Sequence, residues 1–237
     1  MDNEGEFENT VEVTASSVTA LPKTNSRRYI VYDRISKSMI IGKNEDVKSA
    51  MASTTKIMTT IVILEKSDLD ETVTVSAKAG GTGGSRLGLK RGDKASVKDL
   101  LYGLMLRSGN DAAVALAEHV GGSVKEFAEL MNEKAIELGL TNTHFVTPHG
   151  LDDANHYTTA LELAKLTDYA MDNETFAKIV GTKSTTIYIN NQPRQINNTN
   201  ELLGVLNGVV GVKTGFTNNA GRCLVTETKR NNMDIIT

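Results

Sequence analysis

The sequence contains a single cysteine, Cys223, among its 237 residues, and its formal net charge is only −3. One cysteine cannot form an intrachain disulfide, and it cannot build a thiolate cage for a metal ion. A nearly neutral chain also lacks the excess of basic residues that attracts proteins to nucleic acids. We therefore expect a globular protein without a disulfide scaffold and without a nucleic-acid partner.

Long apolar segments are missing as well. The densest apolar run covers residues 57–64, far short of the roughly 20 residues that span a bilayer. The first four residues, Met1-Asp2-Asn3-Glu4, are acidic, whereas a secretory signal begins with basic and then apolar residues. The sequence thus predicts no membrane span, and neither a secretion signal nor a membrane anchor is visible in it.

Patterns that would hold a metal ion or a cofactor are also lacking. The glycine-dense segment 79–85 does not end in the G-K-[ST] of a phosphate-binding loop, and we interpret it as a mobile loop. The spacing of the four histidines does not match that of zinc motifs. These histidines are His119, His144, His149 and His156. We predict no metal site and no cofactor.

Periodicity divides the chain into a polar leader and a folded part. Residues 1–25 show neither helical nor strand periodicity, which indicates a disordered leader or linker. β-Branched and aromatic residues at 28–33 and 39–42 flank the polar turn 34–37, so a hairpin is predicted there. Further strands are predicted at 209–214, at 222–229 and from residue 233 onward.

Helix signals fill the middle of the chain. Residues 57–64 are apolar on nearly every face, which predicts a central buried helix directly after Ser53. A cap residue is followed three positions later by an acid at Ser96, Ser123 and Thr159. With the glycines that follow, these signals predict helices near 97–107, 112–120, 124–138 and 160–171.

The order of these elements predicts an α/β (α+β layered) fold. An antiparallel sheet flanked by helices is expected from residues 26–66 and 182–237, which bracket the predicted helices. Residues 67–181 are expected to form an inserted, mainly helical subdomain.

Ser53 and Lys56 form an S-x-x-K motif at the start of the predicted central helix. Side chains three positions apart share a helix face, so the hydroxyl and the amine can touch. A lysine can act as the base that activates a serine only if its amine is partly neutral, and burial favours the neutral form. By itself the motif is weak, because Ser53 could be a helix cap and Lys56 a solvated residue.

Two further motifs follow in a fixed order. Ser108-Gly109-Asn110 comes after a predicted helix, and Lys213-Thr214-Gly215 lies on a predicted strand. The series S-x-x-K, S-x-N, K-T-G is typical of serine enzymes that form an acyl-enzyme. Gly215 suits either a strand edge along which a peptide lies or an ordinary β-bulge.

With these motifs the chain resembles the serine penicillin-recognising enzymes, in particular the low-molecular-mass penicillin-binding proteins that are D-alanyl-D-alanine carboxypeptidases (peptidase family S11). The likeness covers about residues 26–237, including longer phrases at 52–58, 106–112, 143–152 and 211–217. It implies a β-lactamase/transpeptidase-like fold and a peptidoglycan stem peptide ending in D-Ala-D-Ala as substrate. It also implies covalent inhibition by β-lactam antibiotics, and an exported protein at the outer face of the bacterial cytoplasmic membrane or in the cell wall.

The resemblance implies a role for each motif residue. Ser53 is the expected nucleophile, Lys56 the base for acylation, and Ser108 the hydroxyl that relays a proton to the leaving amine. Asn110 is expected to hold Lys56 and the substrate amide.

The K-T-G strand is expected to bind the substrate. Lys213 and Thr214 would hold its terminal carboxylate beside Gly215. The backbone N–H groups of Ser53 and Phe216 would form the oxyanion hole.

Two alternatives stay open at this point. A class A β-lactamase shares the serine, the lysine and K-T-G, but its water-activating E-x-x-L-N segment has no match between Asn110 and Lys213, and Gly109 stands where those enzymes favour Asp. A noncatalytic penicillin sensor or wall-binding module would keep the same Ser53 without releasing a product.

The resemblance also implies that the domain ends in a longer strand and a final helix. Neither is present before Thr237, and a carboxylate-binding arginine found in many relatives is missing with them. We expect a sheet with an open edge and an uncovered face at this strand.

Overall fold

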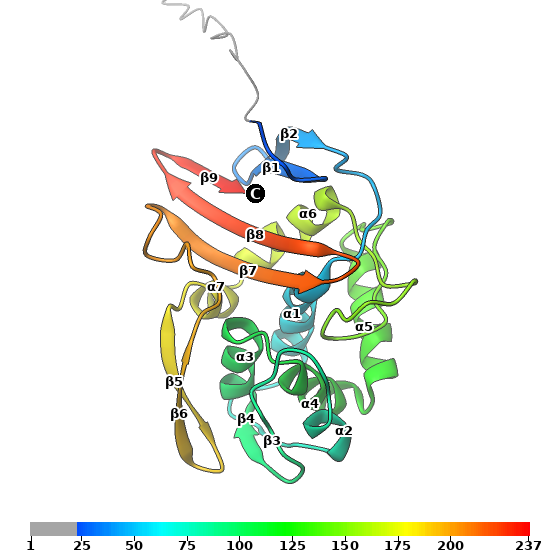
Figure 1. Cartoon of the computed structure of the whole chain (residues 1–237), viewed down its shortest axis with the longest axis vertical. Coiled ribbons are helices and arrows are strands. Elements are labelled where there is room, and N and C mark those ends of the chain that lie inside the picture. The colour runs from blue at the N-terminus through cyan, green and yellow to red at the C-terminus, as the bar shows by residue number, and fades with distance from the viewer. Residues whose placement is uncertain (1–22) are drawn as a thin grey trace, which may run out of the picture.

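In the computed structural model, which describes residues 23–237, a five-stranded antiparallel sheet lies against a group of helices (Figure 1). The strand order is β2-β1-β9-β8-β7, so both ends of the described chain build one sheet. The predicted strands are confirmed as β1 (Tyr29–Asp33), β2 (Ser38–Lys43), β7 (Val209–Thr217), β8 (Gly221–Arg230) and β9 (Met233–Ile236). The leader predicted for residues 1–25 lies almost wholly outside the described residues.

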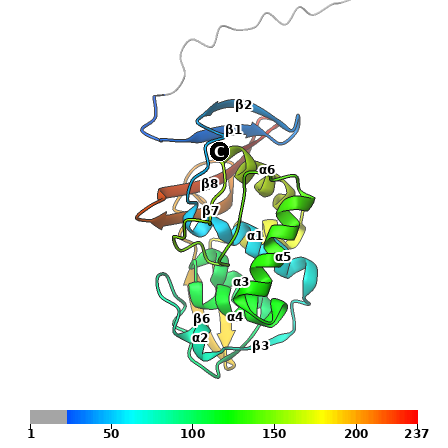
Figure 2. The same ribbon diagram turned by 90° about the vertical axis from the view of Figure 1, so that its right-hand side faces the viewer.

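The helices predicted from capping signals are confirmed within a few residues. Ser96, Ser123 and Thr159 each accept a hydrogen bond from the backbone N–H three positions on, as N-caps do. The helices are α1 (Lys56–Lys66), α3 (Val97–Leu106), α4 (Asn110–Gly121), α5 (Val124–Glu137) and α6 (Ala160–Met171). Helix α1 contacts α3, α4, α5, α6 and also α7 (Glu174–Val180), so it is the central helix that its apolar residues predict (Figure 2).

Short elements escaped the sequence prediction. A single helical turn, η1 (Ala52–Thr55), precedes α1, and α2 (Ala77–Gly80) opens the glycine-dense segment. Strands β3 (Thr72–Thr74) and β4 (Lys94–Ser96) form a small hairpin of their own. Elements this short give no readable periodicity.

The assignment of all of 182–237 to the main sheet is wrong for one hairpin. Strands β5 (Ser184–Ile189) and β6 (Gln192–Asn197) form a separate two-stranded sheet, which lies below the main sheet in Figure 1. Asn190 and Asn191 adopt left-handed backbone conformations and close a tight turn between them. Asn190 also exchanges hydrogen bonds with the backbone of Lys94, which ties this hairpin to β4 instead of to the main sheet.

The open edge expected at the last strand is not found. Strand β9 lies inside the sheet, where Ile236 pairs with Tyr32 of β1 and with Glu227 of β8. The edges of the sheet are β2 and β7.

Arg34, which the sequence places in a polar turn, is buried and joins that turn to three other elements. Its guanidinium donates to Asp168 of α6 at 2.9 Å and to Glu227 of β8 at 2.7 Å. It also lies 3.1 Å from Asp234 of β9. A buried arginine needs such partners because an unpaired charge in the interior is costly.

Within residues 23–237 no helix has the length and apolarity that would let it cross a membrane.

Candidate active site

Three segments bring the sequence motifs together. Turn η1 and the start of α1 carry Ser53 and Lys56, the turn into α4 carries Ser108 and Asn110, and β7 packs against η1. Ser108 has a left-handed backbone with φ of 57°. Such a conformation is uncommon for a residue with a side chain and is concentrated at functional sites.

Lys56 is the centre of the site. Its side chain is fully buried, and its Nζ lies 3.0 Å from Ser53 Oγ, 2.8 Å from Asn110 Oδ1 and 2.8 Å from the backbone oxygen of His149. Burial, and then the nearby positive charge of Lys213, hold the pKa of Lys56 well below its ordinary value. A neutral amine has two N–H groups, which can donate to Asn110 Oδ1 and to the backbone oxygen of His149. Its lone pair can then accept the proton of the Ser53 hydroxyl.

The S-x-N residues complete this side of the site. Asn110 Nδ2 donates to the backbone oxygen of Gly83 at 2.8 Å, so the amide oxygen is turned toward Lys56. Ser108 Oγ is buried and has no hydrogen-bond partner among the described residues. A buried hydroxyl without a partner is costly, and a bound substrate group could supply the missing bond.

Strand β7 supplies the other side. Lys213 is 1% exposed and donates to the backbone oxygen of Thr214 at 2.8 Å. Burial lowers the pKa of Lys213 to about 7. Thr214 Oγ1 lies 2.8 Å from Thr199 Oγ1, and the side chain of Phe216 is exposed.

Gly215 is required by the contact between β7 and η1. A Cβ atom there would lie 2.9 Å from the backbone nitrogen of Ser53 and 3.1 Å from Ala52 Cβ. Gly215 pairs in regular register with Cys223, so the β-bulge interpretation is wrong. The missing side chain lets the strand approach the segment that carries Ser53.

We expect Gly215→Ala to damage both the site and the fold, because the added methyl group meets backbone atoms that cannot move independently. The free energy of unfolding should fall by about 1–3 kcal/mol, and acylation of Ser53 by a penicillin should slow. Thermal melting and the rate of penicillin labelling measure the two effects. Cys223→Ala, opposite Gly215 on β8, is the control, since it changes the same strand pair without adding an atom against η1, and equal behaviour of the two variants would contradict this explanation.

The segment around His149 contributes to the site in a way that the sequence did not predict. The backbone oxygen of His149 is one of the three groups around Lys56 Nζ. The pKa of the His149 ring is lowered to about 3, mainly because the ring is buried. The adjacent Gly150 has φ of +86°, and a Cβ there would overlap the backbone oxygen of Ala52. The phrase at 143–152 is part of the family resemblance and could have directed attention here, although it does not reveal a backbone acceptor.

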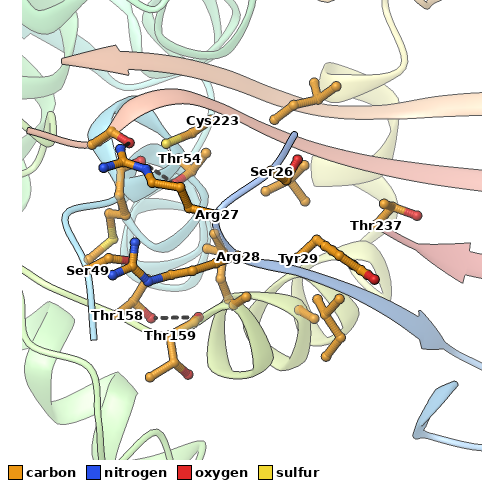
Figure 3. Close-up of a pocket in the computed structure, with 18 of the residues that line it drawn as sticks. Ser26, Arg27, Arg28, Tyr29, Ser49, Thr54, Thr158, Thr159, Cys223 and Thr237 are labelled. Carbon is orange, nitrogen blue, oxygen red and sulfur yellow. Dashed lines mark hydrogen bonds between the residues drawn. The ribbon is translucent and has the colours of Figure 1, made fainter. Parts of the chain in front are cut away.

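A well-formed cavity in the described part of the chain is not the site of the motifs (Figure 3). It has a volume of about 700 Å³ and lies between β1 and β8, where Arg28 and Cys223 face it. Thr54 and Met51 line it, but Ser53 does not. Cys223, predicted to be a buried inert thiol, is only partly buried, and burial raises its pKa.

No group of three or more potential ligand side chains, among those that the structure describes, could hold a metal ion.

Comparison with known proteins places this site in a family. The D-alanyl-D-alanine carboxypeptidase family (peptidase S11) matches residues 13–237. The D-alanyl-D-alanine carboxypeptidase of Streptomyces sp. strain K15 is 40% identical over 212 residues, which cover 82% of this chain and 73% of the relative. The carboxypeptidase DacF of Bacillus subtilis is 38% identical over 213 residues, which cover 87% of this chain and 55% of DacF.

Solved structures agree with the sequence matches. The crystal structure of the Streptomyces K15 DD-transpeptidase is similar to this chain with a TM-score of 0.86 and 35% identity, over 92% of this chain and 90% of that one. The carboxypeptidase DacD of Francisella tularensis has a TM-score of 0.83 and 31% identity, over 92% of this chain and 66% of its own. The predicted β-lactamase/transpeptidase-like fold is thereby confirmed.

The chain spans little more than half the length of several curated relatives, 55% of DacF and 58% of the Escherichia coli carboxypeptidase DacC. The family match nevertheless includes nearly all of the chain, together with every motif described above. The chain belongs to the D-alanyl-D-alanine carboxypeptidase family, peptidase S11.

Proposed function

We propose that the protein is a serine-type D-Ala-D-Ala carboxypeptidase, which removes the terminal D-alanine of peptidoglycan stem peptides through an acyl-enzyme on Ser53. The observation that carries the proposal is the placement of Lys56 Nζ, 3.0 Å from Ser53 Oγ and enclosed without access to solvent. A buried amine with a lowered pKa is the base that a serine nucleophile needs.

Acylation would begin when Lys56 accepts the Ser53 proton and Oγ attacks the carbonyl carbon of the penultimate D-alanine. The oxyanion formed would be stabilised by the backbone N–H groups of Ser53 and Phe216. Donors of this kind typically contribute about 2.7–4 kcal/mol each to the transition state. Ser108 would pass a proton to the leaving amine, the C–N bond would break, and free D-alanine would depart.

The unpaired hydroxyl of Ser108 and the orientation of Asn110 support these roles. The Asn110 amide oxygen accepts a hydrogen bond from Lys56 Nζ. Asn110 would also hold the substrate amide in place. Holding reacting groups in place in this way contributes strongly to rate. Hydrolysis of the Ser53 ester by water would complete the cycle and return the proton to the enzyme.

Lys213 and Thr214, next to Gly215 on β7, are proposed to bind the terminal carboxylate of the substrate. Lys213 is buried and has no carboxylate partner among the described residues, so a substrate carboxylate would supply its missing counter-charge.

The pH profile of kcat/KM should be bell-shaped. Activity should rise as Lys56 loses its proton, at a pH below the ordinary lysine range, because only the neutral amine is a base. It should fall as the pH rises above about 7, because Lys213 then loses the charge that binds the carboxylate. Lys213→Arg keeps its charge and should move the falling limb to higher pH, and an unmoved limb would contradict the role of Lys213.

The acceptor of the acyl group is the point on which the relatives differ. The Streptomyces K15 structure is that of a protein named a DD-transpeptidase, whereas the curated relative from the same strain is named a carboxypeptidase. Both reactions use one acyl-enzyme and differ in whether water or an amine attacks it. We favour water as the acceptor here because the curated relatives are named carboxypeptidases.

A class A-like β-lactamase is less well supported. Rapid hydrolysis of a penicillin needs a carboxylate that activates water. The carboxylate close to Lys56, that of Asp111, already accepts hydrogen bonds from backbone N–H groups. Penicillins should therefore acylate the protein, and the acyl-enzyme that they form should be hydrolysed slowly.

Release of D-alanine tests the proposal directly. The protein is incubated with a peptide ending in D-Ala-D-Ala, and free D-alanine is measured with and without prior exposure to a penicillin. We expect release that the penicillin blocks. Labelling without release would favour a noncatalytic penicillin sensor or wall-binding module, and rapid penicillin turnover would favour a β-lactamase.

Such a substrate would place the protein outside the cytoplasmic membrane, where peptidoglycan lies.

A further inference from the structure

Asp111 is a buried carboxylate that none of the motifs includes. It follows Asn110 at the start of α4, its side chain is fully buried, and it has no basic partner among residues 23–237. Its two oxygens instead accept hydrogen bonds at 2.8–3.0 Å from four backbone N–H groups, those of Leu87, Gly88, Leu89 and Ala112.

These bonds explain how the charge is tolerated. An ionised carboxylate without partners is very costly to bury. Hydrogen bonds to an ionised acceptor are stronger than those between neutral groups, and the N-terminus of a helix also favours negative charge. Asp111 therefore fastens the segment 87–89 to the first turn of α4.

The same loop reaches the proposed catalytic groups. Asn110 donates through its backbone nitrogen to the oxygen of Ser85 at 2.7 Å, and through Nδ2 to the oxygen of Gly83 at 2.8 Å. A Cβ at Gly84 would lie 2.5 Å from Asn110 Nδ2, so the loop lies directly on the amide. Because the backbone oxygen of Gly83 accepts the hydrogen bond from Asn110 Nδ2, the Asn110 amide oxygen faces Lys56 Nζ at 2.8 Å.

We propose that Asp111 is a positioning residue for acyl transfer, whose carboxylate fixes the loop 83–89 so that the Gly83 oxygen holds the Asn110 amide toward Lys56. The inference rests on the proposed function, since it concerns acylation at Ser53. The glycine-dense segment 79–85, interpreted from sequence as a mobile loop, directly precedes the residues 87–89 that Asp111 anchors. Asp111→Asn should release the loop 83–89. Asparagine has an NH₂ group in place of one carboxylate oxygen, and this group cannot accept the hydrogen bonds that the backbone N–H groups donated to that oxygen.

The test compares Asp111→Asn with Asp99→Asn. Asp99 is also a carboxylate in the first turn of a helix, but it contacts Ser96 and not the loop. Labelling by a fluorescent penicillin at increasing concentration gives the maximal acylation rate and the half-saturating concentration. Trypsin cleavage after the exposed Arg86 reports release of the loop.

For Asp111→Asn we expect the maximal acylation rate to fall on the order of 10- to 100-fold. The half-saturating concentration should change much less, because Lys213 and Thr214 lie outside the loop, and cleavage after Arg86 should accelerate. Asp99→Asn should leave all three measurements near those of the unaltered protein. A merely structural role would lower melting temperature without this selective loss of rate.

Failure of this inference is distinguishable from failure of the proposed function. If the unaltered protein is not labelled at Ser53, the proposed function fails. If it is labelled and Asp111→Asn acylates as fast as Asp99→Asn, the positioning role is overturned. Should Asp111→Asn not fold, Leu87→Ala loosens the same loop without disturbing a buried charge, and faster cleavage with an unchanged acylation rate would overturn the role equally.

Discussion

Replacement of Ser53 by alanine should abolish D-alanine release and covalent penicillin labelling, with kcat/KM reduced on the order of 10⁴-fold or more. The alanine variant keeps Lys56, the S-x-N turn and β7, but it has no oxygen on which an acyl group can form. The fold should be retained, because within residues 23–237 the side chain of Ser53 makes a hydrogen bond only to Lys56. Assays of D-alanine release and labelling on the same preparation, together with its melting temperature, check the prediction.

Ser49→Ala is the matched control for this variant. Ser49 precedes η1 in the same segment and pairs with Thr158 through its backbone, so loss of its hydroxyl should leave labelling unchanged. An adduct of the same mass on Ser53→Ala would show that the nucleophile lies elsewhere.

Lys56→Gln should reduce acylation on the order of 10³- to 10⁴-fold while the fold is kept. Glutamine has an amide that can still donate to Asn110 and to the oxygen of His149, which preserves part of the hydrogen bonding around Nζ. An amide has no basic lone pair, so the Ser53 proton has no acceptor. General-base catalysis alone typically contributes 10²- to 10⁴-fold, on the order of the loss expected here.

The control for this variant is Lys66→Gln, at the exposed end of the same helix. It removes one lysine charge from α1 without touching the site, and its acylation rate should equal that of the unaltered protein. If Lys56→Gln labels within about tenfold of Lys66→Gln, Lys56 is not the base and another group must take the proton.

The sequence predicted the regular elements well because their signals are local. Ser96, Ser123 and Thr159 mark helix starts through caps that the structure contains, and the apolar residues after Ser53 identify the central helix. The strands of the main sheet are marked by β-branched and aromatic residues and by the turn residues between them. The β5–β6 hairpin was placed in the wrong sheet because pairing depends on contacts, here between Asn190 and Lys94, that no local pattern encodes.

The site was predictable only where side chains carry the chemistry. Ser53, Lys56, Ser108 and Asn110 belong to motifs whose spacing is informative, and the structure brings Ser53, Lys56 and Asn110 into contact. Their catalytic roles, and those of Lys213, Thr214 and Phe216, remain proposals.

The backbone acceptors at Gly83 and His149 could not be found from sequence, since every residue carries a carbonyl group. Asp111 was passed over because the motif ends at Asn110, and only its burial and its four N–H partners set it apart. The sequence pointed to Gly215 but not to the reason why a glycine is needed there. That reason is the close approach of β7 to η1, which is visible only in three dimensions.

The position of the acyl group tests the central claim most directly. The unaltered protein is incubated with a penicillin, digested with trypsin, and analysed by tandem mass spectrometry for a peptide that carries the drug. The account predicts the adduct on the peptide 49–56, which follows Lys48 and ends at Lys56, with fragment ions that assign the added mass to Ser53. An adduct on any other residue, or no adduct on a folded protein, would contradict it.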